Sequence, residues 1–176
     1  YTFQIAQNKN RDKGKTIEKI HDESRSFLTV NGSFFTKEFK PTGLLISQGE
    51  LLHQKSEAEL LNGIFAIDKN GRGTLYDANK FAQTSSITFA IQNGPILLDE
   101  TQKIKIKSDD HKKASRTAIG LDKDGKIVVI ILKQTLFTDN VLSLYTFAKL
   151  LKDSPELRSL SIHSALNLDG GPSTGM

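Results

Sequence analysis

Short apolar runs separated by turn residues cover most of the chain and predict a strand-rich protein. Apolar or alternating runs occupy residues 1–5, 26–30, 44–46, 63–67, 87–91, 96–98, 117–121, 127–132 and 166–168. Asp124-Gly125 between two of these runs is a strong hairpin signal, because such turns need residues that tolerate a positive φ. The sequence therefore predicts mostly antiparallel strand pairs.

One segment has the periodicity of a helix instead. Its apolar residues recur three and four positions apart, at Leu144, Phe147, Ala148 and Leu151. Asp139 or Asn140 can cap the start of this helix, which we expect to run to about Lys152, with Pro155 beyond its end. Strands in series with one long helix predict an α+β fold with a mainly antiparallel sheet.

The length and the absence of repeats favour one domain over residues 1–176. The polar stretch 103–115 is the longest in the chain, so we expect an exposed excursion there. The sequence opens on a strand-like run without an initiating Met and stops just after a glycine pair. We expect both ends to be trimmed, which leaves room for a leader or an anchor outside this sequence.

Composition narrows the classes of partner. The net charge is +4 and the pI is about 9.2, but the basic residues are scattered and not interleaved with aromatic residues. This balance suits anionic ligands and does not indicate nucleic acid. The chain has no cysteine, which excludes disulfides, Cys-ligated zinc and a thiol nucleophile. No apolar run reaches the length of a transmembrane segment.

Two Asn-Gly pairs follow apolar runs, Asn31-Gly32 and Asn93-Gly94. Each pair can form a simple turn, or its amide side chain can hold a ligand hydroxyl, and the sequence leaves both interpretations open. The two phenylalanines at 34–35 are more typical of a core than of a ligand-stacking surface.

Two further segments carry charge at strand ends. Arg116-Thr117 stands at the entrance to an apolar strand, where the guanidinium either faces solvent or binds a phosphate or carboxylate. Asp169 leaves the last apolar run and is followed by Gly170-Gly171, whose bare backbone lets a ligand approach closely. A turn without chemistry is the alternative for this segment.

Together and in this order, the four segments resemble the phosphodiester glycosidase family, which has bacterial members linked to exopolysaccharide. Residues 31–35, 41–44, 92–95, 116–120 and 166–173 carry the resemblance. Pro172 departs from it, because the family commonly has a further glycine there. The resemblance implies hydrolysis of a sugar-1-phosphodiester, a glycan-type substrate, and a periplasmic or extracellular location.

The chemistry of that reaction suits the residues present. A phosphate monoester is a better leaving group than a sugar alkoxide, so one carboxylate and one cation can suffice. We predict Asp169 and Arg116 as the catalytic pair, with Asp169 acting as nucleophile or as base. The predicted substrate-binding residues are Asn31, Gly32, Asn93, Gly94, Thr117, Gly170, Gly171 and Ser173.

Other chemistries are less favoured. The four histidines, His21, His53, His111 and His163, lack the spacing of metal ligands, so we expect no metal site and no cofactor. His163 is more typical of a satisfied strand residue than of a site residue. Ser173 lacks the Gly-x-Ser-x-Gly elbow of a serine hydrolase. The main rival is a non-catalytic glycan-binding or envelope scaffold module with the same pocket.

Overall fold

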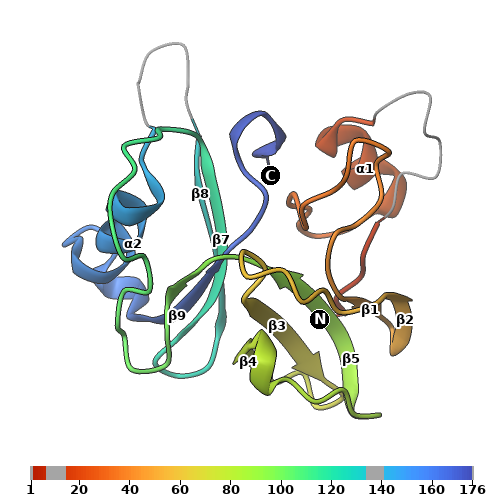
Figure 1. The fold of residues 1–176 in the computed structure, drawn as a ribbon. Helices are drawn as coiled ribbons and strands as arrows, with labels where there is room; N and C mark the ends of the chain where they lie inside the picture. Colours follow the sequence, from red (N-terminus) through yellow and green to blue (C-terminus); the bar gives the residue numbers. More distant parts are fainter. Residues whose placement is uncertain (1, 7–14, 134–140, 176) are drawn as a thin grey trace.

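Two antiparallel sheets pack face to face and form the body of the molecule (Figure 1). The computed structural model describes residues 2–6, 15–133 and 141–175. The first sheet has the order β2-β1-β5-β3-β4, with β2 (Glu50–His53), β1 (Leu45–Ser47), β5 (Ile87–Asn93), β3 (Gly63–Asp68) and β4 (Gly73–Asp77). The second has the order β6-β9-β7-β8, with β6 (Ile96–Leu98), β9 (Ile162–Asn167), β7 (Arg116–Asp122) and β8 (Ile127–Leu132).

The core between the sheets follows from the alternation of side chains along the strands. On β3, Phe65 and Ile67 point to the second sheet, where they pack in one cluster with Ile119 and Leu166. The intervening residues of β3 point to the opposite face, which Tyr76 and Phe81 help to cover. β3 is therefore buried on both faces, which explains why it appears in the sequence as a continuous apolar run.

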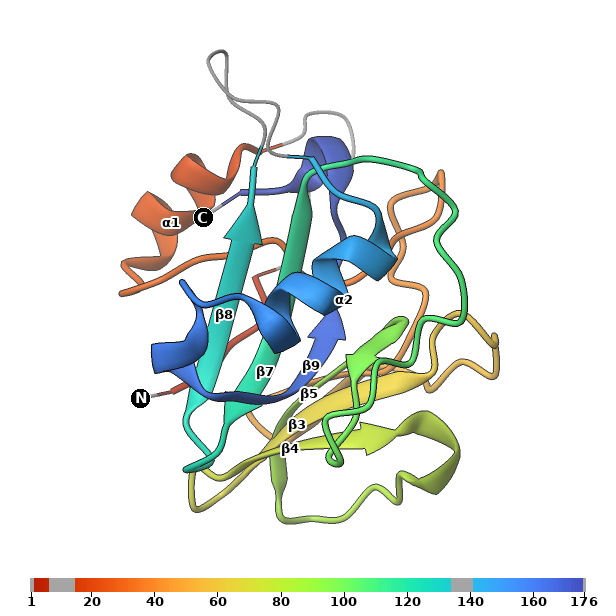
Figure 2. The ribbon, with the colours of Figure 1, turned by 90° about the vertical axis from the view of Figure 1, so that its left-hand side faces the viewer.

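Helix α2 (Leu144–Asp153) covers the outer face of the second sheet (Figure 2). Phe147 is fully buried against this sheet, which presents the small side chains Ala118 and Ala165 there. The predicted apolar face of the helix is confirmed. The helix begins one residue after Ser143, whose hydroxyl accepts from the Thr146 amide at 3.1 Å, whereas the expected caps at 139 and 140 lie outside the described residues.

The predicted fold class is confirmed: the chain is α+β, with two antiparallel sheets and few helices. The expected strands at 44–46, 63–67, 87–91, 96–98, 117–121 and 127–132, and the one entering 168, correspond to β1, β3, β5, β6, β7, β8 and β9. The hairpin around Asp124-Gly125 joins β7 to β8 as predicted. The stretch 103–115 is mostly exposed, as expected.

Two expected strands are wrong. The described residues 2–5 and residues 26–30 form no strand. In the second segment, Ser26 and Thr29 bond to one another through their hydroxyls at 2.6 Å, and Thr29 also contacts His21 at 3.1 Å. Side-chain hydrogen bonds of this kind compete with a strand ladder. The preceding helix α1 (Ile17–Ser24) was not predicted; it has only two apolar residues, Ile17 and Ile20, and buries none of its residues fully.

Three 3₁₀ turns complete the secondary structure: η1 (Ala78–Lys80), η2 (Arg158–Leu160) and η3 (Gly171–Ser173). Within the described part of the chain, no helix is long and apolar enough to cross a bilayer. The turn η3 follows directly on Asp169 and Gly170, two of the predicted site residues.

Candidate active site

The segments that the sequence singles out meet at one end of the second sheet, where β7 begins and β9 ends (Figure 1). The Asp169 amide donates to the Gly32 carbonyl at 3.0 Å, and the Gly171 amide donates to the Ser115 carbonyl at 2.8 Å. The first bond joins residues that are 137 positions apart in the chain, and the second joins residues 56 positions apart, before β7 and after β9. The frame of the site is therefore built from backbone hydrogen bonds.

Asn31 is the side chain that ties these segments together. Its Nδ2 donates to the Asp169 carbonyl, and its Oδ1 accepts from Thr117 Oγ1 at 2.8 Å and from the Gly175 amide at 3.2 Å. Thr117 is fully buried. The structure therefore places the predicted binding residues Asn31 and Thr117 together, with their polar atoms engaged in protein contacts.

A second group of polar side chains is buried beside this tie. Asn93 donates through Nδ2 to the Gly32 carbonyl at 3.1 Å, and Asn167 donates through Nδ2 to the Gly94 carbonyl at 2.9 Å. The Oδ1 atoms of both amides and the Thr174 hydroxyl have no hydrogen-bond partner. Buried polar atoms of this kind are rare and need an explanation such as a bound water or ligand.

Asn167 and Thr174 were not predicted as site residues. Asn167 stands between Leu166 and Leu168, where the sequence gives an alternating strand and no separate signal for a site. The structure, not the sequence, marks Asn167 as a candidate site residue. Its side chain is buried at the end of β9, where Asn167 pairs with Ala118 of β7.

Asp169 is a half-buried carboxylate held by its own turn. The Gly170 amide donates to Oδ1 at 2.9 Å, and the Ser173 hydroxyl also bonds to the carboxylate. Burial raises the pKa of Asp169 above its ordinary value, and the two hydrogen bonds oppose that rise. A carboxyl with a raised pKa in a partly open position is a recognised feature of functional sites.

Glycine is required at positions 171 and 94 for different structural reasons. Gly171 has φ of 60°, the left-handed conformation that lets the chain turn sharply after Asp169. Gly94 has no room for a side chain, because a Cβ there would lie 1.9 Å from the Leu60 carbonyl oxygen. Gly94 thus allows two chain segments to pack, and its predicted substrate contact stays a prediction.

The guanidinium of Arg116 is engaged by backbone. Its Nε donates to the Leu142 carbonyl at 2.9 Å and its Nη2 donates to the Lys112 carbonyl at 2.6 Å. Burial lowers the pKa of Arg116, and the charge of Asp110 opposes this shift. These contacts connect the end of the 103–115 excursion to the segment before helix α2. The catalytic role of Arg116 stays a prediction.

A hollow of about 470 Å³ opens beside the Asp169 turn. Its lining combines the glycine turn with two basic side chains: Lys113, Ala114, Ser115, Lys133, Val141, Gly171, Pro172 and Thr174. The sequence analysis placed Lys113 among scattered surface lysines, because nothing in the chain links it to Lys133. The fold brings both lysines to a hollow that Thr174 also lines, and the hydroxyl of Thr174 is buried without a hydrogen-bond partner.

The phenylalanines at 34–35 are not both in the core, and that expectation is wrong for Phe35. Phe34 is half-buried, but Phe35 is 51% exposed and stacks on Phe39, which is 66% exposed. The hairpin that carries them is turned outward, since Phe35 pairs with Pro41 in an isolated bridge rather than in either sheet.

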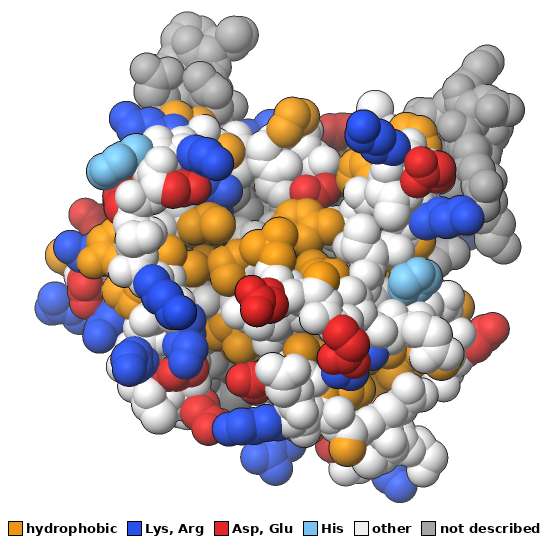
Figure 3. Space-filling model, viewed as in Figure 1, with side chains coloured by type: hydrophobic (Ala, Val, Ile, Leu, Met, Phe, Trp, Pro, Cys, Tyr) orange, Lys and Arg blue, Asp and Glu red, His pale blue; other side chains and the backbone are white. Residues whose placement is uncertain are grey.

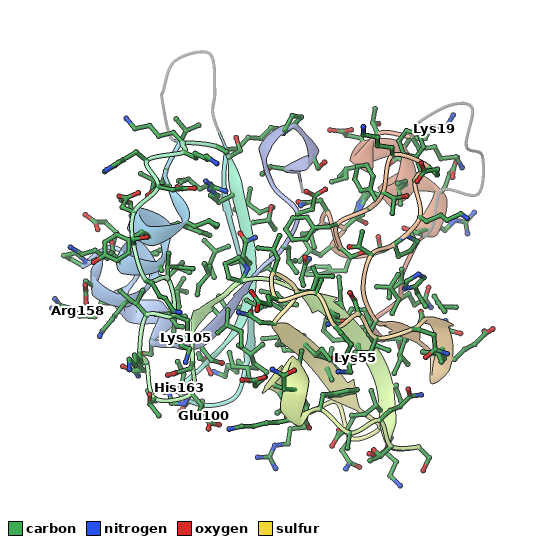
Figure 4. All side chains as sticks on the ribbon, viewed as in Figure 1. Lys19, Lys55, Glu100, Lys105, Arg158 and His163 are labelled. Carbon is green, nitrogen blue, oxygen red and sulfur yellow. The ribbon has the colours of Figure 1, made fainter. Side chains whose placement is uncertain are left out.

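The histidines do not gather at the site. Figure 4 labels His163 at the end of β9 that lies away from Asp169. Over the residues that the structure describes, no group of three or more His, Cys, Asp or Glu side chains could hold a metal ion.

Comparisons with known proteins identify the family of this chain. The sequence pattern of the family described as "Phosphodiester glycosidase" matches residues 25–176, which include every predicted site residue. The uncharacterized protein YigE of Escherichia coli K12 is 24% identical over 164 residues, which cover 88% of this chain and 59% of that protein.

The fold is also found among solved structures. The crystal structure of a hypothetical protein from Synechocystis matches with a TM-score of 0.54 and 16% identity, covering 90% of this chain and 48% of that one. The chain thus spans only about half to three fifths of the length of these relatives. Because the family pattern covers most of the sequence, this chain belongs to the phosphodiester glycosidase family.

Proposed function

We propose that this protein hydrolyses the bond between C1 of a sugar and the oxygen of a phosphodiester, releasing free sugar and a phosphomonoester. One observation carries the proposal: the half-buried carboxylate of Asp169 stands two residues before Gly171, and Gly171 lines a hollow together with Lys113 and Lys133. A carboxylate suits the positive charge that develops on the sugar, and the lysines suit the phosphate.

The reaction balances with these groups. The C1–O bond breaks, the electron pair leaves with the phosphate, and water supplies a hydroxyl to C1 and a proton to solvent or to the base. Asp169 acts on C1 directly as nucleophile or takes the proton from water. Burial of Asp169 strengthens its electrostatic effect on an oxocarbenium-like centre, because nearby water screens it less.

Neutral polar groups are buried close to the Asp169 turn. Asn93, Asn167 and Thr174 each keep a buried polar atom without a partner. An ordered water would satisfy these atoms, which makes this end of the sheet polar inside as well as at its surface. We place Gly170 and Ser173 at the carboxylate itself, where they keep it charged.

A second function is favoured by the contacts of Arg116. Its Nε and Nη2 hydrogen-bond to backbone carbonyls, and the cations nearest to the hollow are flexible lysines. A site with a carboxylate and no fixed cation on the phosphate suits a glycan-binding or envelope scaffold module that does not turn over. The periplasmic or extracellular location and a role in exopolysaccharide metabolism belong to either version of the proposal.

The test is direct. The protein is incubated with the methyl phosphodiester of N-acetylglucosamine 1-phosphate, and free sugar and methyl phosphate are measured together over time. Equal amounts of the two products support the hydrolase. Saturable binding of the same compound without product supports the binding module, and neither binding nor product contradicts both functions.

A further inference from the structure

Phe35 and Phe39 form an exposed, stacked pair of rings. Their centroids lie 5.8 Å apart with 20° between the planes, and each side chain is at least half exposed. Figure 3 shows hydrophobic side chains gathered in the middle of the face that lies between the two halves of the molecule. Exposed large apolar groups that form a patch mark an interaction surface more often than single ones do.

The backbone holds this pair in place. The Thr36 amide donates to the Lys40 carbonyl at 2.8 Å, and the Phe39 amide donates to the Thr36 carbonyl at 2.9 Å. Phe39 has φ of 58°, which is uncommon for a bulky residue. The hydrogen bonds of the turn thus hold the Phe39 backbone at a positive φ, which a bulky residue disfavours, and this conformation places the Phe39 ring against Phe35. A surface ordered in advance loses less entropy when a ligand binds.

The pair is continuous with the candidate active site. Gly32, whose carbonyl accepts from Asp169 at 3.0 Å, precedes Phe35 by three residues. Three peptide units span at most about 11 Å between Cα atoms, so the rings lie within reach of a short oligosaccharide bound at Asp169. The lysine-lined hollow is a different place, because residues 113–115, Lys133 after β8 and the turn η3 line it and neither ring does.

We propose that the Phe35–Phe39 pair is a stacking platform for a sugar ring of an oligosaccharide that extends from the glycosyl side of the cleaved bond. This inference rests on the proposed function and names its substrate class: a glycan chain carrying the phosphodiester, not a single sugar. The C–H face of a pyranose packs on the flat aromatic surface, while its hydroxyls stay in water.

The surroundings of the pair are polar. Lys37, Glu38 and Lys40 flank Phe39, so two lysines stand against one glutamate there. An excess of lysines attracts the acidic groups of a glycan and an anionic lipid surface alike, so charge does not select between them. The short separation of Phe35 from Gly32 favours the glycan, because Gly32 contacts the Asp169 amide and a chain bound there reaches the rings.

The test compares a double variant with matched controls. Phe35→Ala/Phe39→Ala removes the platform, Phe35→Tyr keeps a ring, and Leu160→Ala removes an exposed apolar side chain of η2. Two kinds of measurement are made on each protein. Calorimetry measures binding of chitotetraose and of tetragalacturonate, and kinetics compare the methyl phosphodiester of N-acetylglucosamine 1-phosphate with the same phosphodiester on chitotetraose.

We expect at least one tetrasaccharide to bind the wild type and to bind the double variant about three- to tenfold more weakly. The double variant should raise KM for the long phosphodiester by the same factor and leave KM for the short one unchanged. Phe35→Tyr and Leu160→Ala should behave as wild type.

Each other outcome has a distinct meaning. Wild-type turnover with equal KM for both phosphodiesters and no tetrasaccharide binding overturns the platform and leaves the proposed function standing. Ring-dependent tetrasaccharide binding without turnover contradicts the hydrolase and leaves the platform standing. Loss of pelleting with phosphatidylglycerol vesicles, or of self-association in sedimentation, confined to the double variant assigns the rings to a membrane or to a second copy and overturns the proposal.

Discussion

Replacing Asn31 by Ala tests whether this side chain is the structural tie of the site. The change removes the hydrogen bonds from Thr117 Oγ1 at 2.8 Å and from the Gly175 amide at 3.2 Å, and the one donated to Asp169. Each is worth about 1 kcal/mol, and the Thr117 hydroxyl, fully buried, is left without a partner at a cost of about 1–3 kcal/mol. We therefore expect the free energy of unfolding to fall by about 4–6 kcal/mol.

Urea denaturation measures this loss, and two controls define it. Asn79→Ala changes an exposed asparagine, so it should alter stability by no more than about 0.5 kcal/mol. Thr117→Val removes the hydroxyl that Asn31→Ala leaves unpaired. The free energy of unfolding of the double variant should therefore fall by about 1 kcal/mol less than the sum of the losses in the two single variants. If Asn31→Ala is as stable as Asn79→Ala and only raises KM, Asn31 is a substrate ligand and the tie is refuted.

Three further changes separate chemistry from packing. Ser173→Ala removes a hydrogen bond that lowers the pKa of Asp169, so the acid limb of the pH profile of kcat/KM should move to higher pH; an unmoved limb contradicts Asp169 as the titrating group. Arg116→Lys keeps the charge but loses the planar fork that bonds the carbonyls of Lys112 and Leu142, so the midpoint of urea unfolding should fall and calorimetry should show similar changes for a sugar 1-phosphate and for the free sugar. A loss confined to the sugar 1-phosphate would instead place Arg116 on the phosphate. Gly94→Ala places a Cβ 1.9 Å from the Leu60 carbonyl oxygen and should destabilise the fold by about 1–3 kcal/mol in urea; a wild-type midpoint contradicts this packing.

The strands could be predicted where local signals agree with the fold. β8 was predicted at its observed bounds, because a continuous apolar run and the turn at Asp124-Gly125 both define it. The strand expected at 26–30 failed because hydroxyl side chains there bond to one another, which no hydropathy pattern records. Helix α1 was missed since it lies on the surface and buries none of its residues.

The candidate site was predictable as a set of segments but not as a set of contacts. Asn-Gly and Asp-Gly-Gly steps at strand ends are visible in the sequence, and the fold brings them together. The sequence does not predict where the Arg116 side chain points, because its partners are the backbone carbonyls of residues 112 and 142, which only the fold brings close. The exposure of Phe35 depends on the turn that the chain makes at residues 36–39, and this tertiary choice overrides the usual burial of phenylalanine.

The central claim is that the carboxylate of Asp169 catalyses the hydrolysis of the glycosyl–phosphate bond. The variant Asp169→Asn tests this claim most directly. An amide has nearly the same shape but no charge, and because burial disfavours the charged form, the variant should be no less stable at neutral pH. Release of N-acetylglucosamine from its methyl 1-phosphodiester should fall at least about 100-fold, with the circular dichroism spectrum unchanged. A folded Asp169→Asn protein that releases sugar at the wild-type rate would contradict the account.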